Sequence, residues 1–328
     1  MSGPRVAVLG AGAVGAACAR ALADGGARVR VIDPGAGRAA GSWAAAGILS
    51  PSHPESLPGP VHALAARSLE LWEDIAREHP AVELRHTGLV LVGDDPGWLA
   101  WRAARGLADE AAAWTRADGS EVAAHRFPEV RVVRTPRVAP ALLADLPVEA
   151  ATVPLEQLRA ESDVVVIAAG AWAGPLLDAA GGGATVGPRR GQMLLFEDGR
   201  IDTVLMEAGP GGVQLAVPRA DGRVVVGTTL EDVGFDAGTV PADLDRLEAW
   251  ARAWVPGLGA REAAWSGFRP WSDRPVPLIG HVGPGLVAAV GHFRNGILLA
   301  PATGELVADL VLGRAPRVTP EDFSARPA

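Results

Sequence analysis

Two residue types are missing from this chain of 328 residues: it contains no lysine and no tyrosine. All 30 basic side chains are therefore arginines. The absence of lysine excludes a lysine base, a Schiff-base nucleophile and a compact ammonium point charge. The absence of tyrosine means that no phenolic hydroxyl can donate a proton or contact a substrate.

Cysteine is almost as rare, since Cys18 is the only one. A single cysteine cannot form an intramolecular disulfide, and we expect Cys18 to be a small core residue of the first predicted helix. No apolar run is long enough to span a membrane, and the N-terminal residues do not resemble a signal peptide. We therefore expect a cytoplasmic protein.

The charge balance is acidic, with a formal net charge of -8 and a pI of about 5.4. We find no basic stripe of the kind that binds nucleic acid. The histidines have no metal-ligand spacing, and no nucleophile motif of a hydrolase is present. We therefore expect no nucleic-acid partner, no membrane partner and no metal site.

The N-terminal residues have the pattern of a strand, a turn, a helix and a second strand. Short apolar runs at Arg5–Leu9 and Val29–Ile32 predict two buried strands, and the alanine-rich segment Val14–Ala23 predicts the helix between them. This is one βαβ unit of the size that dinucleotide-binding folds use.

The turn has the sequence GAGAVG, with glycines at Gly10, Gly12 and Gly15. The first glycine permits a tight turn, the second lets the backbone approach a pyrophosphate, and the third lets the helix lie close to the sheet. Asp33 ends the second strand, where a carboxylate can accept hydrogen bonds from ribose hydroxyls. The motif predicts a dinucleotide site but does not separate NAD from FAD.

The remaining elements follow from hydrophobic periodicity and from turn residues. Helices are predicted at Ala63–Glu78, Trp98–Arg116, Ala139–Asp145, Leu244–Trp254 and Ile297–Leu312. Strands are predicted within residues 82–94 and at Val164–Ala168, Val186–Phe196, Val213–Pro218, Val224–Thr229, Ala263–Phe268 and Leu286–Val290. The apolar run that begins at Val164 is typical of a parallel strand, and we expect it beside the first strand.

This order of elements predicts an α/β chain (α+β overall) of about two domains. Residues 1–80, 137–186 and 272–328 form a discontinuous Rossmann-like domain in this interpretation. Residues 81–136 and 187–271 form an inserted, antiparallel β-sheet domain that binds the substrate.

Six further segments resemble motifs of the FAD-dependent D-amino-acid oxidase family, and they are most similar to its glycine oxidase branch. In chain order they read GSWAAAGILSP, AAGAWAG, PRRGQMLLFE, VPRADGRVVVGTTLEDVGF, SGFRPWSDRPVPLIG and GHFRNGILLAPATGELVADLVLG. The resemblance covers nearly the whole chain, and it is weakest at residues 132–163. It implies a noncovalent FAD cofactor, because Cys18 lies in the first helix rather than at the flavin.

Matched motif by motif, the resemblance implies a set of cofactor contacts. The set comprises Gly10, Gly12, Ala13, Val14 and Gly15 at the pyrophosphate, Asp33 and Pro34 at the adenosine ribose, Gly41, Ser42, Ala46, Gly47 and Ile48 along the ribitol and flavin, Val153 at the adenine, Ala169 and Gly170 beside the cofactor, and His292, Phe293, Arg294, Asn295, Gly296, Ile297 and Leu298 at the flavin.

The last of these segments enters the C-terminal helix, and the positive end of that helix would favour an anionic reduced flavin. We expect Gly296 to allow a sharp entry and a close approach. Asn295, the only asparagine, is expected either to adopt a left-handed backbone or to cap the helix.

Two arginines match substrate residues of the family. Arg269 matches the arginine that binds the substrate carboxylate, and Arg294 matches a second arginine near the substrate. A planar guanidinium suits this task because it binds a carboxylate through two parallel hydrogen bonds. Arg189 and Arg190 are expected to lie at the entrance or in solvent.

The sequence departs from the glycine oxidase pattern before its VPR motif, where a tyrosine is usual. Leu215 and Ala216 occupy this stretch, so the pocket is expected to be larger or more apolar than a glycine site. Gln214 would replace the missing hydroxyl only if it faced inward, and strand alternation opposes this for neighbours. Trp271 and His53 are further candidates to fill the space.

The resemblance implies oxidation of a small amino acid, such as glycine, sarcosine or a D-amino acid, to an imine that hydrolyses to a keto acid. Dioxygen would be the electron acceptor and hydrogen peroxide a product, in a homo-oligomeric enzyme with a role in thiamine biosynthesis. Three alternatives stay open: a D-amino-acid dehydrogenase or other flavin amine oxidase, an NAD-dependent dehydrogenase, and a flavoprotein without catalysis.

Overall fold

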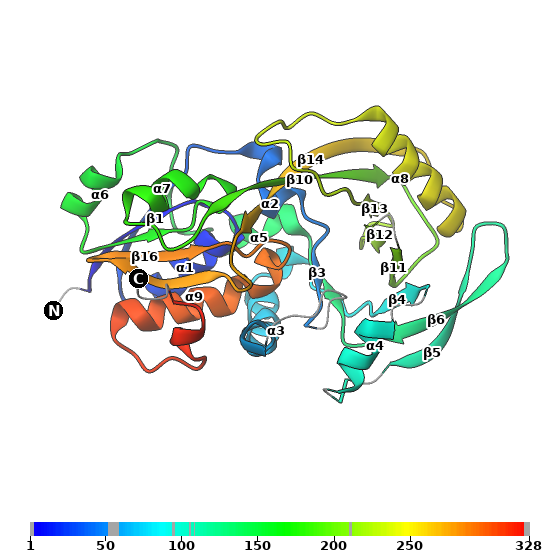
Figure 1. Cartoon of the computed structure of the whole chain (residues 1–328), viewed down its shortest axis with the longest axis horizontal. Coiled ribbons are helices and arrows are strands. Elements are labelled where there is room, and N and C mark those ends of the chain that lie inside the picture. Colours follow the sequence, from blue (N-terminus) through cyan, green and yellow to red (C-terminus); the bar gives the residue numbers. More distant parts are fainter. Residues whose placement is uncertain are drawn as a thin grey trace.

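Two β-sheets, one in each half of an elongated molecule, organise this computed structural model (Figure 1). The structure describes residues 3–51, 59–93, 96–104, 106–107, 109–209 and 212–324. His53, one of the residues predicted to fill the pocket, lies outside these ranges. Within them, no helix has the length and apolar character needed to cross a membrane.

The first sheet has six strands and is mostly parallel. Its order is β15 (Leu278–Gly283), β16 (Leu286–Val290), β9 (Val164–Ile167), β1 (Arg5–Leu9), β2 (Arg28–Ile32) and β8 (Val148–Glu149). Only β15 runs antiparallel to its neighbour. The predicted position of β9 beside β1 is confirmed, since Val6 pairs with Val164.

Helices cover both faces of this sheet. They are α1 (Ala13–Asp24), α3 (Gly59–Glu78) and α9 (Gly296–Leu312) on one face, and α6 (Leu155–Glu161) and α7 (Gly174–Ala179) on the other (Figure 1). Side chains that alternate along β1 divide between the faces, because Val6 and Val8 pack with α1 and α9 whereas Ala7 and Leu9 pack with α6.

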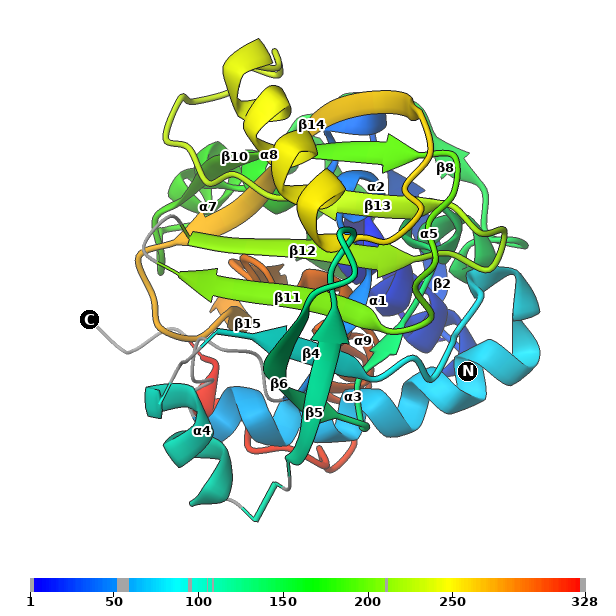
Figure 2. The same ribbon diagram turned by 90° about the vertical axis from the view of Figure 1, so that its right-hand side faces the viewer.

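The second sheet has eight strands and lies in the other half (Figure 2). Its order is β14 (Arg261–Ser272), β10 (Val186–Phe196), β13 (Val224–Gly227), β12 (Gly212–Pro218), β11 (Val204–Gly209), β4 (Leu89–Val92), β6 (Glu121–Phe127) and β5 (Glu110–Thr115). The prediction of an antiparallel sheet needs one correction, because β11 and β4 run parallel. A long stretch of chain connects these two strands, as a parallel pair requires.

The two faces of the second sheet have different neighbours. Helix α8 (Pro241–Trp254) covers one face, where Leu194, Ala216 and Val226 are buried. On the other face, Met193, Leu215 and other apolar side chains pack toward the first half of the molecule. Strand alternation alone separates these two sets.

Strands β10 and β14 run from one half of the molecule to the other (Figure 1). At the start of β10, Val186 packs with Ile167 and Leu278 of the first sheet. At its end, Phe196 packs in the cluster covered by α8. These strands therefore bring the inner face of the second sheet close to the carboxyl ends of the parallel strands.

The predicted helix at Trp98–Arg116 is wrong in its second half. Helix α4 covers only Pro96–Ala103, and the alanine-rich continuation forms β5, which pairs with β6 in a hairpin. Tertiary contacts override local helix propensity here. The indole of Trp114 is buried, and its N–H donates to the carbonyl of Trp254, 2.8 Å away.

The remaining short elements connect the two halves. They are α2 (Gly41–Ala44), β3 (Ile48–Leu49), β7 (Arg131–Val132), which pairs with β3, and α5 (Thr135–Leu142). The helix predicted at Ala139–Asp145 therefore begins and ends earlier. Pro136 explains the earlier start, because proline suits the first turn of a helix.

Candidate functional site

The glycine turn between β1 and α1 leaves no space for a side chain at two of its glycines. Gly10 has φ +109°, and a Cβ there would lie 2.4 Å from the carbonyl oxygen of Ala168. A Cβ at Gly15 would lie 1.9 Å from the carbonyl oxygen of Gly10. The first and third glycines are therefore required for the turn and for the close approach of α1 to the sheet.

The N-terminus of α1 fits a pyrophosphate. Its N-cap residue is Gly12, which has no side chain to cap the helix, and its first turn has no acidic residue. The N–H of Ala13 donates to the hydroxyl of Ser42, 2.8 Å away, which brings α2 beside the turn. Val14 is partly exposed. The Ala13 N–H is occupied by the Ser42 hydroxyl, but the helix dipole still makes such a terminus attractive to an anion.

Asp33 lies beside the same turn, at the end of β2. Its two carboxylate oxygens accept hydrogen bonds from the N–H groups of Ala11 and Gly35, each at 2.6 Å. Pro34 follows directly, and Val153 is partly buried against the cluster of Leu9 and Ile32. The predicted ribose contact of Asp33 stays a prediction.

Ala169 and Gly170 follow β9, on the other side of β1 from β2. Gly170 has φ +55°, a left-handed conformation that glycine adopts without strain. Three predicted contact segments, after β1, β2 and β9, thus lie at the carboxyl ends of adjacent parallel strands. Open α/β sheets bind their ligands at this edge.

The segment from Gly41 to Ile48 is held by its carbonyl groups. Four consecutive carbonyl oxygens accept hydrogen bonds: Ala44 from the Trp265 indole (3.1 Å), Ala45 from the Thr135 hydroxyl (2.8 Å), Ala46 from Arg219 Nη2 (3.0 Å) and Gly47 from the Val133 N–H (2.9 Å). These carbonyls are occupied by protein donors. The N–H groups of Trp43, Ala44 and Ala45 are occupied as well, since they donate to the carbonyls of Ala40 and Gly41. A ligand would therefore meet mainly the small side chains of this segment, which fits a flat ring.

None of these anchoring side chains was predicted. Arg219 lies in the VPR motif, and it also donates to the carbonyl of Val133 at 3.0 Å. Burial lowers the pKa of Arg219 to about 10, so it stays protonated at neutral pH. The only signal in the sequence was its place in a motif, and the motif did not reveal the partner.

The loop before α9 differs from its prediction in three details. The left-handed residue is Phe293, with φ +47°, and not Asn295, whose φ is -100°. Asn295 occupies the N-cap position, but its side chain makes no cap hydrogen bond. Gly296 needs no special conformation, and a Cβ there would meet only the Cβ of His292 at an ordinary 3.7 Å.

The side chains at the two ends of this loop point into the protein, whereas those of Phe293, Arg294 and Asn295 are partly exposed. His292 is buried, and its Nε2 lies 3.0 Å from the hydroxyl of Thr303. Burial lowers its pKa to about 4, so the ring is neutral at pH 7. Ile297 and Leu298 are buried in the core. With neither a side-chain cap nor an acid in its first turn, α9 presents its N–H groups and the positive end of its dipole.

One hydrogen bond joins this loop to the strand that carries Arg269. The N–H of Phe293 donates to the carbonyl oxygen of Pro270, 3.0 Å away. Arg294 follows Phe293 and Arg269 precedes Pro270, and both arginines are half-buried. The structure thus brings the two predicted substrate residues to the same place, beside the start of α9.

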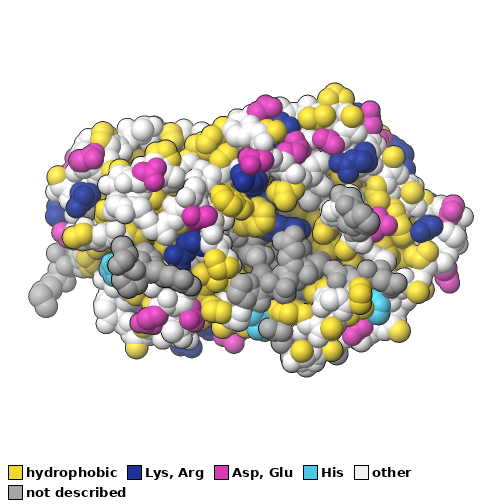
Figure 3. Space-filling view, viewed as in Figure 1, with side chains coloured by type: hydrophobic (Ala, Val, Ile, Leu, Met, Phe, Trp, Pro, Cys, Tyr) yellow, Lys and Arg dark blue, Asp and Glu magenta, His cyan; other side chains and the backbone are white. Residues whose placement is uncertain are grey.

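The inner face of the second sheet roofs this region with apolar side chains. Leu215 packs in one cluster with Met193 and Met206, and Ala46 and Ile48 pack against that cluster. The space-filling view shows hydrophobic side chains and arginines gathered at the middle of the molecule, between its halves (Figure 3).

Two residues weighed for the pocket have other surroundings. Gln214 alternates with Leu215, so it lies on the face that α8 covers and does not replace the missing hydroxyl. The ring of Trp271 lies under the guanidinium of Arg189, at 4.4 Å.

Arg190 was expected at the entrance or in solvent, and this is wrong. It is 3% exposed and forms ion pairs with Glu231 and Asp236. Its backbone forms a two-bond bridge with Glu231, so the side chain points into protein instead of an opening. Among the residues that the structure describes, no group of three or more His, Cys, Asp or Glu side chains could hold a metal ion.

Comparisons with known proteins agree with this geometry. A glycine oxidase from Pseudomonas aeruginosa is 32% identical over 358 aligned residues, which cover 98% of each chain. A bifunctional protein ThiO/ThiG from Synechocystis is 38% identical over 162 residues, 46% of this chain and 23% of its own length. The crystal structure of glycine oxidase from Geobacillus kaustophilus has a TM-score of 0.82 and 26% identity, with 99% of each chain covered.

The family described as FAD dependent oxidoreductase (DAO) matches residues 5–310. The match includes the glycine turn, the segment from Gly41 to Ile48, Arg269 and the start of α9. The resemblance to the D-amino-acid oxidase family is thereby confirmed for the chain as a whole, and this protein belongs to the DAO family of FAD-dependent oxidoreductases.

Proposed function

We propose that this protein oxidises the CH–NH bond of a small α-amino acid, with the substrate carboxylate bound by Arg269. The observation that carries the proposal is the hydrogen bond between Phe293 and Pro270, because it joins the strand of Arg269 to the uncapped start of α9. The relatives named glycine oxidase support a small amino acid as the substrate. Membership of a FAD-dependent family rules out the nicotinamide-dependent alternative.

Bound FAD supplies the acceptor for the hydride that leaves the substrate Cα. The protein's share of the chemistry is orientation. The Arg269 fork would fix the carboxylate in one plane, and the apolar roof of Met193, Met206 and Leu215 would exclude water from the opposite side. Arg294 would contribute a second positive charge near the substrate.

The protein offers no lysine or tyrosine to remove a proton, and His292 is buried away from solvent. A positioned neutral amine would therefore react without a dedicated base. The pH dependence of turnover would then follow the ionisation of the substrate amine rather than that of a side chain.

The positive end of α9 would favour negative charge on the ligand that it faces, by up to about 2 kcal/mol in a buried geometry. The N–H groups of Gly296 and Ile297 would donate from this helix terminus. Gly10, Gly12 and the start of α1 would hold the pyrophosphate, and Asp33 the ribose.

Dioxygen is the proposed electron acceptor, with hydrogen peroxide as the product. The similarity to a ThiO/ThiG protein supports a supply of imine for thiamine biosynthesis. We also propose a homo-oligomer and the domain boundaries given above, with residues 1–80, 137–186 and 272–328 binding FAD.

The apolar surroundings of Leu215 favour a second substrate class. Leu215 brings no hydroxyl for a substrate amine, and its neighbours Met193 and Met206 are apolar, so this side of the site would favour an N-methyl or side-chain carbon. Sarcosine or a D-amino acid would fit it at least as well as glycine, and a dehydrogenase that uses another acceptor would fit the same site.

The test is to purify the holoprotein, record its visible spectrum and add amino acids without oxygen. We expect a flavin spectrum that bleaches with at least one of glycine, sarcosine and D-alanine. Readmission of oxygen should then restore the colour and release peroxide. Bleaching without peroxide would favour the dehydrogenase, and a flavin that no amino acid bleaches would contradict the proposal.

A further inference from the structure

The guanidinium of Arg269 lies over a glycine of the neighbouring strand. In the ladder of β14 and β10, Arg269 pairs with Arg189, and its side chain reaches diagonally to Gly191. A Cβ at Gly191 would lie 2.1 Å from Nη1, 2.4 Å from Nη2 and 2.5 Å from Cζ of Arg269. Gly191 has no left-handed backbone. Its lack of a side chain is needed for space alone.

Three oxygen atoms orient this guanidinium. Nη1 donates to the carbonyls of Arg190 (3.2 Å) and Thr229 (3.1 Å), and Nη2 donates to the hydroxyl of Thr228 (2.6 Å). The Thr228 hydroxyl itself donates to the carbonyl of Thr229, 3.2 Å away. Its proton is thereby directed away from Arg269, and its oxygen lone pair toward it. All three acceptors are neutral groups, and together they restrict the rotation of the guanidinium.

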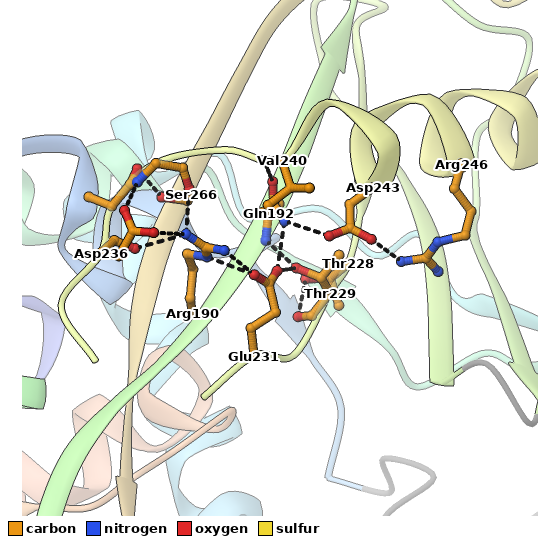
Figure 4. Close-up of polar contacts among 12 residues, drawn as sticks. Arg190, Gln192, Thr228, Thr229, Glu231, Asp236, Val240, Asp243, Arg246 and Ser266 are labelled. Atoms are coloured by element: carbon orange, nitrogen blue, oxygen red, sulfur yellow. Dashed lines mark hydrogen bonds and ion pairs between the residues drawn. The ribbon is translucent and has the colours of Figure 1, made fainter. Parts of the chain in front are cut away.

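A buried polar network holds two of these acceptors in place (Figure 4). The backbones of Arg190 and Glu231 exchange two hydrogen bonds, of 2.9 and 3.0 Å. The hydroxyl of Thr229 contacts the Glu231 carboxylate and accepts from the Gln192 N–H at 3.0 Å. Gln192 is fully buried, and its side-chain oxygen accepts a hydrogen bond from the N–H of Val240 at 2.6 Å. Val240 ends the connection that starts at Thr228, so Gln192 bonds to both ends of this connection.

The network also pairs the guanidinium of Arg190 with two carboxylates. Arg190 Nε donates to Glu231 at 2.8 Å, and Nη1 donates to Asp236 at 2.8 Å. Two adjacent carboxylates thus occupy Arg190, while its backbone carbonyl serves Arg269. A buried, satisfied network of this kind gives its members one fixed arrangement.

We propose that Gly191 and Thr228 are positioning residues that aim the Arg269 guanidinium at the substrate carboxylate. This inference rests on the proposed function, because it presupposes that Arg269 binds the carboxylate. Gly191 provides the space in which the guanidinium lies, and Thr228 fixes its rotation. A misplacement of about 1 Å in a clamp of this kind is costly for an oriented reaction.

The experiment compares Gly191→Ala with Gly187→Ala in the FAD-loaded enzyme. Gly187 lies on the same strand, and a Cβ there would meet nothing within 4 Å. Acetate serves as the carboxylate probe, and its dissociation constant is read from the visible flavin spectrum. We expect Gly191→Ala to raise this constant at least about tenfold, and Gly187→Ala to change it less than about twofold.

A second pair of variants tests the hydroxyl. Thr228→Val keeps the shape of the side chain and removes the acceptor, whereas Thr228→Ser keeps the acceptor. We expect Thr228→Val to raise the acetate dissociation constant, and the KM of the amino acid that bleaches the flavin fastest, about three- to tenfold. Thr228→Ser should restore both to within about twofold. A merely structural threonine would move the melting temperature without this recovery of binding.

Arg269→Ala separates the failure of this inference from the failure of the proposed function. If Arg269→Ala loses acetate while Gly191→Ala and Thr228→Val bind it normally, the clamp stands and the positioning inference is overturned. If Arg269→Ala binds acetate normally and stays yellow, the clamp itself is wrong. If Gly191→Ala does not retain FAD, the comparison of Thr228→Val with Thr228→Ser tests the positioning inference in its place.

Discussion

The turn before α1 and the loop before α9 both place glycine at the entry to a helix, but only the first needs it there. A side chain at Gly10 or Gly15 would clash with the backbone of the neighbouring strand or turn. A side chain at Gly296 would have ordinary contacts. The first turn is thus shaped by steric exclusion, and the second by contacts with Pro270 and by the left-handed Phe293.

This difference teaches what a sequence motif can specify. Steric exclusion restricts a position to glycine, so the spacing of GAGAVG reveals it even though the clash at Gly10 is with Ala168, far away in the sequence. The second loop owes its shape to the hydrogen bond with Pro270 and to the left-handed Phe293, which no glycine marks in the sequence. Contacts within the chain do not require a glycine at Gly296, and its predicted close approach to the cofactor stays a prediction. Four substitutions or conditions can break or sharpen this contrast.

The largest effect is expected for Gly10→Ala. The new Cβ would clash with the Ala168 carbonyl and force a non-glycine residue to adopt φ +109°. We expect a loss of at least ~3 kcal/mol in unfolding free energy and a colourless protein without FAD. Urea unfolding and the visible spectrum provide the measurements.

The matched control for this change is Gly26→Ala. Gly26 has φ +91°, but nothing lies within 4 Å of its would-be Cβ. It should cost only about 1–2 kcal/mol of backbone strain and keep its FAD. Equal losses in the two variants would show that strain, and not lack of space, shapes the first turn.

Acid should weaken the second loop through His292. Its pKa falls from an ordinary value of 6.5 to about 4 on burial, so only the unfolded chain takes up this proton between those values. Stability should therefore fall as pH drops from about 6.5 to 4, by ~3 kcal/mol in total at about 1.4 kcal/mol per pKa unit. Urea unfolding at a series of pH values measures this loss.

His292→Gln supplies the comparison, because glutamine can still bond Thr303 but does not titrate in this range. Its stability should depend less on pH between about 6.5 and 4 than that of the unchanged protein. Parallel pH profiles for the two proteins would mean that His292 is protonated in the fold or is not the group responsible.

Arg219→Met probes the segment from Gly41 to Ile48, which we propose lies along the flavin and call the flavin segment. Like the second loop, this segment is held by contacts with other parts of the chain. The change removes the donors to the carbonyls of Ala46 and Val133. We expect a loss of about 2 kcal/mol in stability and roughly tenfold weaker FAD binding. Arg223→Met in the same hairpin is the control, because its ion pairs are at the surface and are worth about 0–1 kcal/mol. Similar FAD affinities in the two variants would argue against a role for the anchor.

The smallest effect is expected for Gly296→Ala. The position has room for a methyl group and an ordinary backbone, so stability should stay within about 1 kcal/mol of the unchanged protein. FAD should be retained, as the visible spectrum will show. Loss of FAD in this variant would break the contrast, because it would mean that the glycine is needed for a close approach to the cofactor.

Much of the fold was predictable, and the failures have one cause. Strand β10 has the predicted bounds, Val186–Phe196. The helix predicted at Trp98–Arg116 failed where Trp114 found a partner 140 residues away in α8. Local propensity predicted the elements correctly wherever tertiary contacts agreed with it.

The candidate site divides in the same way. Family motifs identified the segments that meet at the sheet edge, and the structure places them together. They did not identify Thr135, Arg219 and Trp265, which hold the flavin segment from positions 90, 173 and 221 residues distant from the carbonyls that they bind. The direction in which Gln214 points likewise became known only from the sheet of the folded structure.

The sequence by itself determined the glycine turn, the βαβ unit and the alternation of faces along each strand, because these follow from the size, the spacing and the polarity of residues along the chain. Only the tertiary structure decided which carbonyls of the flavin segment are occupied, where Arg190 is neutralised and how Arg269 is oriented. Hydrogen-bond partners for these groups come from distant strands, so they exist only once the chain has folded.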